Sequence, residues 1–389
     1  MNTGRNMESP MIYLDNAATT WPKPSCVTEA VCDAIVRCGG NPGRGGHRLA
    51  LAAGELLYEA RDAVAAFFGC DDPFRVSFTQ NITMAVNLVL RGYLKAGDHV
   101  LISPMEHNAV MRPLSALGVR WDVIPHTDDG KIEPDRIAGL VRPETKLIIL
   151  CHESNVNGVV QPLREAAKAA HEKGILLLAD CAQSAGTLPL DIEADQIDFL
   201  CFTGHKGLLG PTGTGGVIFG SRVDIDCIDP LVRGGTGSLS ESITQPEFLP
   251  DRFESGTQNV CGFAGLNAGI RWITEQGRET LFAKEQALIR KLENGLSGIR
   301  GLRVYSGEGT VLSVTIDGAD NGVAAAQLEE RYGVMTRIGL HCAPMAHRTL
   351  GAFPDGTIRF AVSPFTSEAE ISLCIDGCAE LAEDAWKKN

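Results

Sequence analysis

The chain has 389 residues, 12 of them cysteine, and a formal net charge of −13 at pH 7. Its length predicts two domains, and its hydrophobic fraction of 44% argues against a disordered chain. The acidic balance argues against a nucleic-acid partner. The longest apolar run, Ala63 to Phe68, is far shorter than the ~20 residues of a membrane span, and the N-terminus lacks the apolar region of a signal peptide. We therefore expect a cytoplasmic protein that binds neither nucleic acid nor a membrane.

The cysteine spacing argues against zinc and against disulfides. The chain contains no C-x2-C pair, and the nearest approach to one is Cys374 with Cys378. A long chain without a signal peptide is typical of a reducing compartment, where disulfides are rare. We expect no metal site, and we expect most of the thiols to be small buried hydrophobic groups.

The first two thirds of the chain alternate short apolar runs with longer helical patterns. Apolar runs such as LIILC and ILLLA do not alternate with polar residues, which is typical of strands buried on both faces. Strands are predicted at 76–79, 99–103, 147–151, 175–179, 199–203 and 216–219, and helices at 83–93 and 163–173. This order predicts an α/β fold with a large, mostly parallel sheet.

The pattern changes near residue 260. A long helical stretch is predicted from 263 to about 296, and a smaller α+β pattern follows it. That pattern comprises strands at 303–305, 311–316 and 357–362, a helix at 324–332 and a last helix from 367 to 386, where Ser367 and Glu370 fit a capping box. We predict an N-terminal segment (1–20), a large domain (21–260) and a small C-terminal domain (261–389).

The clearest local signal is DFLCFTGHKGLLGPTGTGG, residues 198–216. A buried strand leads directly into Lys206 and a glycine-rich loop. Burying a lysine is costly unless the amine has a task, and burial lowers the amine pKa as a nucleophile requires. The alternative is a surface lysine in a turn.

Two further polar side chains follow predicted strands. Asp180 ends the strand of LLLADCAQSAG, at the edge where open α/β sheets bind ligands, although an aspartate there can also be a helix N-cap. Thr83, in FTQNITMAVN, begins a helix whose N–H groups and hydroxyl would suit a phosphate, although simple capping explains it equally.

Together these signals resemble the class V aminotransferase family of pyridoxal-phosphate enzymes, fold type I, and specifically its cysteine desulfurase and selenocysteine lyase branch. The resemblance extends over nearly the whole chain. It rests on YLDNAATT (13–20), MEHNAV (105–110), HESNVNG (152–158), DCAQSAG (180–186), FTGHKGLLGPTGTG (202–215), RFESGTQN (252–259) and RFAVSPFTS (359–367). It implies a large cofactor domain with a mostly parallel sheet and a smaller α+β C-terminal domain.

The resemblance also implies roles for individual residues in binding pyridoxal 5'-phosphate. Lys206 would attach the cofactor covalently, Asp180 would pair with the pyridine nitrogen and His107 would stack on the ring. Gln183 would bond the ring hydroxyl, with Asn155 beside it and the substrate. The phosphate would be held by Thr83, Thr203 and His205, and by Thr257 of the neighbouring subunit in an obligate homodimer with a shared site.

The segment MTRIGLHCAPMAH (335–347) carries the residue expected to act as nucleophile. Cys342 matches the reactive cysteine of the desulfurase branch, on a short segment expected to be ordered. Arg337 and His341 lie close in sequence, and positive charge there would favour the thiolate. Leu340 and Pro344 depart from residues common in that branch, which leaves specificity and acceptor docking open.

Two other arginines bear on substrate binding. Arg359, in TIRFAVSP, resembles the arginine that clamps the substrate α-carboxylate, a group that a guanidinium fork fits; the alternative is an arginine at a strand edge. Arg337 is a second candidate for substrate contact. Arg44 and His47, in NPGRGGH, would line the entrance to the site.

The leading hypothesis is therefore conversion of L-cysteine to L-alanine, leaving a persulfide on Cys342 for transfer to an acceptor protein that the sequence does not identify. Three alternatives stay open. They are selenocysteine lyase activity, a class V aminotransferase in which Cys342 has no role, and a binding protein that keeps the fold without turnover.

Overall fold

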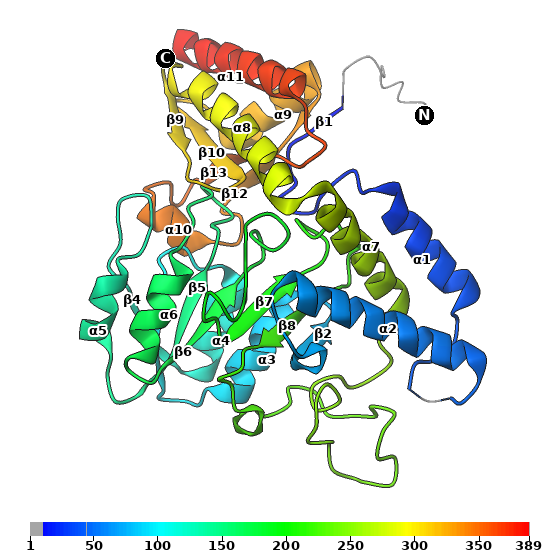
Figure 1. Ribbon diagram of the computed structural model, residues 1–389. Helices are drawn as coiled ribbons and strands as arrows, with labels where there is room; N and C mark the ends of the chain where they lie inside the picture. Colours follow the sequence, from blue (N-terminus) through cyan, green and yellow to red (C-terminus); the bar gives the residue numbers. More distant parts are fainter. Residues whose placement is uncertain (1–10, 44, 389) are drawn as a thin grey trace.

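The computed structural model describes residues 11–43 and 45–388 (Figure 1). Its largest sheet has seven strands in the order β2-β8-β7-β6-β5-β3-β4. These strands are β2 (Val76–Thr79), β3 (His99–Ile102), β4 (Arg120–Val123), β5 (Thr145–Cys151), β6 (Leu176–Asp180), β7 (Phe199–Thr203) and β8 (Gly215–Phe219). Within this sheet only β8 is antiparallel to its neighbours, so the other strands all end at one edge.

Helices cover both faces of the large sheet, which explains why its central strands are apolar throughout. One face packs against α3 (Ile82–Tyr93) and α4 (Asn108–Leu117). The other packs against α2 (Arg48–Phe67), α5 (Ile137–Leu140), α6 (Leu163–His171) and α7 (Val260–Gln276). Helix α1 (Ser25–Arg37) lies along the outside of α7 (Figure 1).

A second, smaller sheet lies at the top of Figure 1. It is antiparallel, in the order β12-β13-β10-β9, with β9 (Leu302–Tyr305), β10 (Val311–Ile316), β12 (Arg337–Gly339) and β13 (Thr357–Ala361). Its core is shared with α8 (Arg278–Ser297), α9 (Asn321–Tyr332) and α11 (Glu368–Lys388). The N-terminal β1 (Ile12–Tyr13) pairs in parallel with β11 (Val334–Met335), and α10 (Pro344–Thr349) follows the turn after β12.

The structure agrees closely with most predicted elements. Each predicted strand is present with ends within two residues, and the capping box is confirmed because Glu370 N donates to Ser367 Oγ at 3.3 Å while Ser367 N donates to Glu370 Oε2 at 2.7 Å. The long helical stretch predicted from 263 to about 296 consists of two helices. Gly277, with φ of +83°, separates α7 from α8, since a left-handed residue ends a helix.

The two helices on either side of Gly277 belong to different cores. The α7 side chains Phe263, Leu266 and Ile270 pack in the core of the large sheet, whereas Leu288 and Leu292 of α8 pack in the core of the small sheet. The domain boundary at residue 260 stays a prediction, and the packing changes at Gly277.

Candidate active site

Most of the predicted site residues follow strands of the large sheet at the edge where those strands end. Thr83 follows β2, His107 follows β3, Asn155 follows β5, Asp180 ends β6 and Lys206 follows β7. Parallel strands bring such residues together although they are far apart in sequence. The segment from β12 to α10, which carries Cys342, reaches the same edge from the small sheet.

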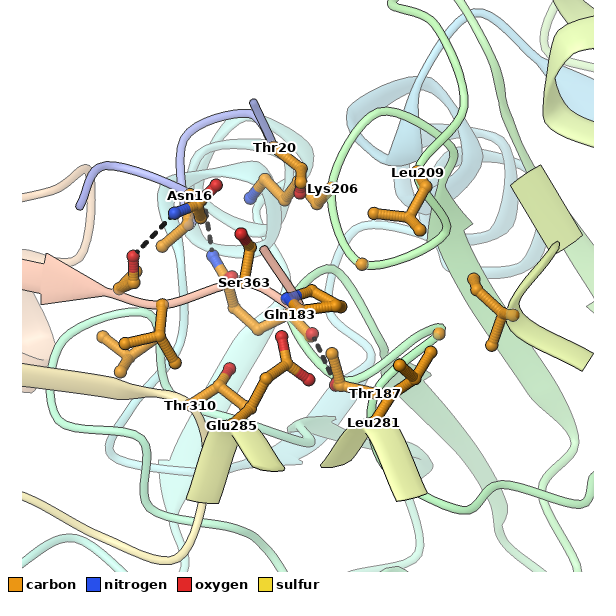
Figure 2. A pocket seen from close by; sticks show the side chains of 18 residues that line it. Asn16, Thr20, Gln183, Thr187, Lys206, Leu209, Leu281, Glu285, Thr310 and Ser363 are labelled. Carbon is orange, nitrogen blue, oxygen red and sulfur yellow. Dashed lines mark hydrogen bonds between the residues drawn. The ribbon is translucent and has the colours of Figure 1, made fainter. Parts of the chain in front are cut away.

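Lys206 is partly buried and lines a cavity with Gln183, Ser363 and Glu285, as Figure 2 shows. Desolvation lowers the pKa of its amine to about 8, the Arg359 charge adds to that shift, and the Asp180 carboxylate opposes it. A larger fraction of the amine is therefore neutral near pH 7 than in an ordinary lysine, as a nucleophile or base requires. The structure does not support the alternative of a surface lysine in a turn.

Asp180 is fully enclosed by the sheet. Its Oδ1 accepts from Ala182 N at 3.0 Å, and it is in register with Cys151 on β5 and Cys201 on β7. Burial raises the pKa of Asp180, against the Ala182 hydrogen bond and the Lys206 charge. Burial also raises the pKa of both thiols, so the groups beside the carboxylate are neutral. A cation placed next to Asp180 would meet a buried carboxylate whose two strand neighbours in register are uncharged.

Two amide side chains bound the space near Asp180. Gln183 is buried, and its Nε2 donates to Ala17 O at 3.0 Å. Asn155 is buried, its Nδ2 donates to His341 O at 2.7 Å, and its Oδ1 is enclosed without a hydrogen-bond partner in the described part of the chain. Unsatisfied buried oxygens are costly in folded proteins and point to a missing ligand.

His107 is the N-cap of α4. Its Nδ1 accepts from Ala109 N at 3.0 Å, so the neutral ring carries its proton on Nε2. Burial and the Lys206 charge lower the pKa of His107 to about 4. The ring is therefore neutral at physiological pH and offers an N–H donor.

The residues predicted to hold a phosphate differ in how deeply they are buried. Thr203 is buried and donates to Thr214 O at 3.4 Å, while burial lowers the pKa of His205 to about 4 and its Nδ1 has no partner among the described residues. Thr83 is exposed at the start of α3, which Asn81 caps through Met84 N at 3.0 Å.

Thr257 is exposed, and Asn41 Nδ2 donates to its hydroxyl at 3.5 Å. It lines a cavity of about 260 Å³ together with Gln80 and Met84, near the N-terminus of α3. Its predicted role toward a neighbouring subunit stays a prediction.

Arg359 lies on β13 with its guanidinium almost fully buried. Its Nη2 pairs with Asp15 Oδ1 at 2.9 Å and its Nη1 donates to Asn155 O at 3.1 Å, whereas its Nε is enclosed without a partner in the described part of the chain. Arg337 is half-exposed and lies 3.9 Å from Asp15 Oδ2. Two arginines thus share one aspartate, which leaves a net positive charge suited to a carboxylate.

Cys342 is exposed and lies in a tight turn in which Ala343 N donates to Leu340 O at 2.7 Å. Both central residues of this turn, His341 and Cys342, have positive φ, +48° and +57°. Asn108 N also donates to Cys342 O at 2.8 Å. Together with the bond from Asn155, this contact joins the cysteine turn to the large sheet on an ordered segment.

One expectation about this turn is wrong. His341 supplies no positive charge beside Cys342, because burial and the Arg359 charge lower the pKa of His341 to about 2. Pro344 begins α10, His47 caps α2 through Ala50 N, and Arg44 lies outside the described residues.

Comparison with known proteins agrees with this geometry. The family model described as aminotransferase class-V matches residues 12–373. The chain belongs to the class V aminotransferase family. A probable cysteine desulfurase from Methanothermobacter thermautotrophicus is 34% identical, over 95% of this chain and 94% of its own length. A cysteine desulfurase from Haloferax volcanii is 31% identical, over 95% of this chain and 88% of its own length.

Solved structures of class V relatives have the same fold. The apo cysteine desulfurase from Thermococcus onnurineus NA1 is 30% identical with a TM-score of 0.88, covering 96% of this chain and 95% of that one. The cysteine desulfurase CsdA from Escherichia coli, solved in an S-sulfonic acid form, is 27% identical with a TM-score of 0.85, covering 96% and 94%. The fold is thus the type I architecture expected from the motifs.

The structure adds acidic residues of this class V chain that the sequence analysis did not assign. Asp15 lies within the YLDNAATT motif and Glu106 directly precedes His107, so both were present in quoted motifs without a role. Glu106 accepts from Ser103 Oγ at 2.5 Å and Cys151 N at 2.8 Å, and burial raises its pKa to about 8.

No helix in residues 11–43 and 45–388 is long and apolar enough to cross a membrane.

Proposed function

We propose that the protein is a pyridoxal-phosphate-dependent cysteine desulfurase that passes the sulfur of L-cysteine through Cys342. The observation that carries the proposal is the hydrogen bond from Asn155 Nδ2 to His341 O at 2.7 Å. Asn155 follows β5 beside Asp180, and His341 directly precedes Cys342. One side chain therefore joins the edge expected to bind the cofactor to the turn that carries the thiol.

The residues present fit pyridoxal 5'-phosphate. Asn155 Oδ1 and His205 Nδ1 are buried polar atoms without partners in the described chain, and the Asp180 carboxylate is enclosed without a cation in register. A pyridinium nitrogen would meet Asp180, a ring hydroxyl would meet Asn155 or Gln183, and a phosphate would meet His205 with the N-terminus of α3. When bound, the cofactor supplies an electron sink for the substrate Cα.

The chain's own groups would then act as follows. Arg359 binds the α-carboxylate through the guanidinium N–H groups that its bonds to Asp15 and Asn155 leave free, Nε–H among them. The Lys206 amine, whose pKa is lowered to about 8, accepts the proton from the substrate Cα. His107 offers its Nε2–H to the developing negative charge as a neutral donor.

Cys342 would act on the sulfur. A bond forms between the Cys342 sulfur and the substrate sulfur, the substrate carbon–sulfur bond breaks, and the carbon skeleton takes a proton and leaves as L-alanine. The persulfide keeps the second sulfur, so no outside oxidant or reductant is needed. We propose that a sulfur-acceptor protein then removes it, because Cys342 is exposed.

We also propose a cytoplasmic homodimer in which Thr257 completes the phosphate site of its neighbour. The exposed hydroxyl of Thr257 and the exposed apolar side chains that precede it, Val232, Ile243 and Phe248, support this arrangement. Mixing Lys206→Ala and Thr257→Val subunits tests it. A shared site predicts that mixed dimers regain activity that neither variant has alone. Activity no higher than the average of the two variants would refute the shared site.

The activity is tested by supplying L-cysteine to the holoenzyme together with a dithiol, which reduces the Cys342 persulfide and releases its outer sulfur as sulfide, and by measuring L-alanine and sulfide. Equal amounts of both are expected without a keto acid. L-alanine formation that requires a keto acid would favour an aminotransferase. A much higher turnover on selenocysteine than on cysteine would favour a selenocysteine lyase.

A further inference from the structure

A chain of buried hydrogen bonds connects the two neighbours of Cys342. His341 Nε2 lies 2.9 Å from Thr357 Oγ1, and the same hydroxyl lies 3.3 Å from His347 Nε2. His347 Nδ1 then lies 2.9 Å from Ala343 O. All three side chains are buried. This series of hydrogen bonds begins at the His341 side chain and ends at the Ala343 carbonyl, so it connects the residues on either side of Cys342.

Elementary hydrogen-bond chemistry assigns every proton in this chain. Ala343 O only accepts, so His347 Nδ1 carries a hydrogen. Burial lowers the pKa of His347, so its ring is neutral and its Nε2 accepts from the Thr357 hydroxyl. That hydroxyl has a single hydrogen, so its oxygen must accept from His341 Nε2–H.

The same assignment leaves His341 with a bare Nδ1. Burial and the Arg359 and Arg337 charges lower the pKa of His341, so the ring stays neutral at physiological pH. Its Nδ1 is enclosed and has no partner in the described part of the chain. His341 is therefore held as one tautomer, with its N–H toward Thr357.

The turn between the two ends of this hydrogen-bond series, residues 340–343, is strained. A residue other than glycine in the left-handed region is strained, and such conformations persist only where the surroundings over-determine them. Both His341 and Cys342 adopt it, with φ of +48° and +57°. Hydrogen bonds from Asn108 N and from the Asn155 side chain hold the turn from the large sheet. The hydrogen bonds among His341, Thr357 and His347 hold it from the small sheet.

We propose that Thr357 and His347 are positioning residues for Cys342, holding His341 in one tautomer and thereby fixing the strained turn in which the thiol meets the substrate sulfur. The kinetic part of this inference rests on the proposed desulfurase function. The structural part, the stability of the turn, does not.

The test compares Thr357→Val, which removes the shared hydroxyl at nearly constant shape, with Thr357→Ser, which keeps it. Thr315→Val on the adjacent β10 is the matched control, since the Thr315 hydroxyl contacts only Tyr305 Oη among the described residues, at 3.5 Å. We expect Thr357→Val to lower kcat for L-alanine formation by about tenfold or more, with KM for L-cysteine within about twofold. Thr357→Ser should restore kcat, and Thr315→Val should not lower it.

Amide hydrogen exchange gives a readout that needs no turnover. In Thr357→Val the peptide containing the Ala343 N–H, which closes the turn, should exchange about tenfold faster than in the wild type. His347→Asn is a second variant in case Thr357→Val does not fold. Its Nδ2 can still donate to Ala343 O, but the shorter side chain places no acceptor at the position of His347 Nε2, so kcat should fall in the same direction.

Two results would overturn the proposal. One is a Thr357→Val enzyme with wild-type kcat and exchange, and the other is a Thr357→Ser enzyme impaired as severely as Thr357→Val. A wild-type enzyme that makes no L-alanine from L-cysteine would instead refute the proposed function, and the exchange measurement would still decide the inference.

Discussion

The two chemical centres of this molecule are built in opposite ways. The region of Lys206 and Asp180 is assembled from the ends of neighbouring parallel strands, and its groups are tuned by removal from water. In the turn of Cys342 the cysteine itself is exposed, and the geometry of the turn comes from hydrogen bonds that hold two residues in left-handed conformations. The first region is rigid because of its fold, and the second because of specific contacts.

This difference indicates how each region should respond to substitution. Strand ends keep their positions when one side chain changes, so substitutions near Lys206 should alter chemistry and leave the fold intact. The cysteine turn depends on individual bonds, so removing one bond should alter position as well as chemistry. Asn155 and Arg359 touch both regions, because Arg359 Nη1 donates to Asn155 O and Asn155 donates to His341 O.

The largest effect is expected from a substitution that disables the lysine region alone. Lys206→Ala removes the amine that we assign to cofactor attachment and to the Cα proton, so L-alanine formation should fall by more than roughly 10³-fold. The visible absorbance of the attached cofactor should disappear, while exchange at the Cys342 turn stays unchanged. Retention of that absorbance would contradict the assignment of Lys206.

Cys342→Ala breaks the other region alone. Release of L-alanine from L-cysteine should fall by more than roughly 10²-fold, because no nucleophile remains to take the sulfur. The cofactor absorbance should be that of the wild type, since no strand end is changed. Cys227→Ala, which removes another exposed thiol, is the matched control. A full rate in Cys342→Ala would show that this thiol has no role.

A smaller effect is expected where the two regions meet. Arg359→Lys keeps the charge but loses the planar fork that pairs with Asp15 and Asn155. KM for L-cysteine should rise by about tenfold, and kcat should change less. Arg337→Lys, at a half-exposed arginine 3.9 Å from Asp15, should change KM by less than about threefold. Steady-state kinetics of both variants would check this order, and a reversed order would make Arg337 the main carboxylate ligand.

The smallest effect concerns stability and pH in the lysine region. Burial raises the pKa of Glu106 from 4.5 to about 8, so the folded protein keeps a proton that the unfolded chain loses above pH 4.5. The stabilisation from that proton is full below pH 4.5 and is lost as the pH rises to about 8. Glu106→Gln should therefore make the Tm of the apo-protein less dependent on pH between 5 and 8. The same substitution at the exposed Glu59 should leave the pH dependence of Tm unchanged. Equal slopes of Tm against pH for Glu106→Gln and the wild type would contradict a buried, protonated Glu106 carboxyl.

The sequence predicted the lysine region well because its signals are local. Buried strands read as unbroken apolar runs, and polar residues directly after them lie at one edge by the geometry of parallel sheets. The positions of Lys206 and Asp180 followed from strand order, whereas Asn155 and His107 came only from the resemblance to the family, and the roles of all four stay predictions.

The cysteine turn was predicted only in part because its contacts are long-range. The motif identified Cys342, but the partners of its turn come from Asn108, Asn155 and Thr357, which no spacing rule connects to it. His341 was expected to carry charge, and only its burial shows that it is neutral. The break at Gly277 was missed for a similar reason, since a helical pattern continues on both sides of the glycine although the two helices pack in different cores.

The central claim is that the two centres act on one substrate molecule, and mass spectrometry of Cys342 tests it most directly. After a single exposure of the holoenzyme to L-cysteine, the peptide carrying Cys342 should gain the mass of one sulfur atom, with one L-alanine released per sulfur. Lys206→Ala should show no added sulfur. L-alanine release with no sulfur on Cys342, or with the sulfur on another thiol, would contradict the account.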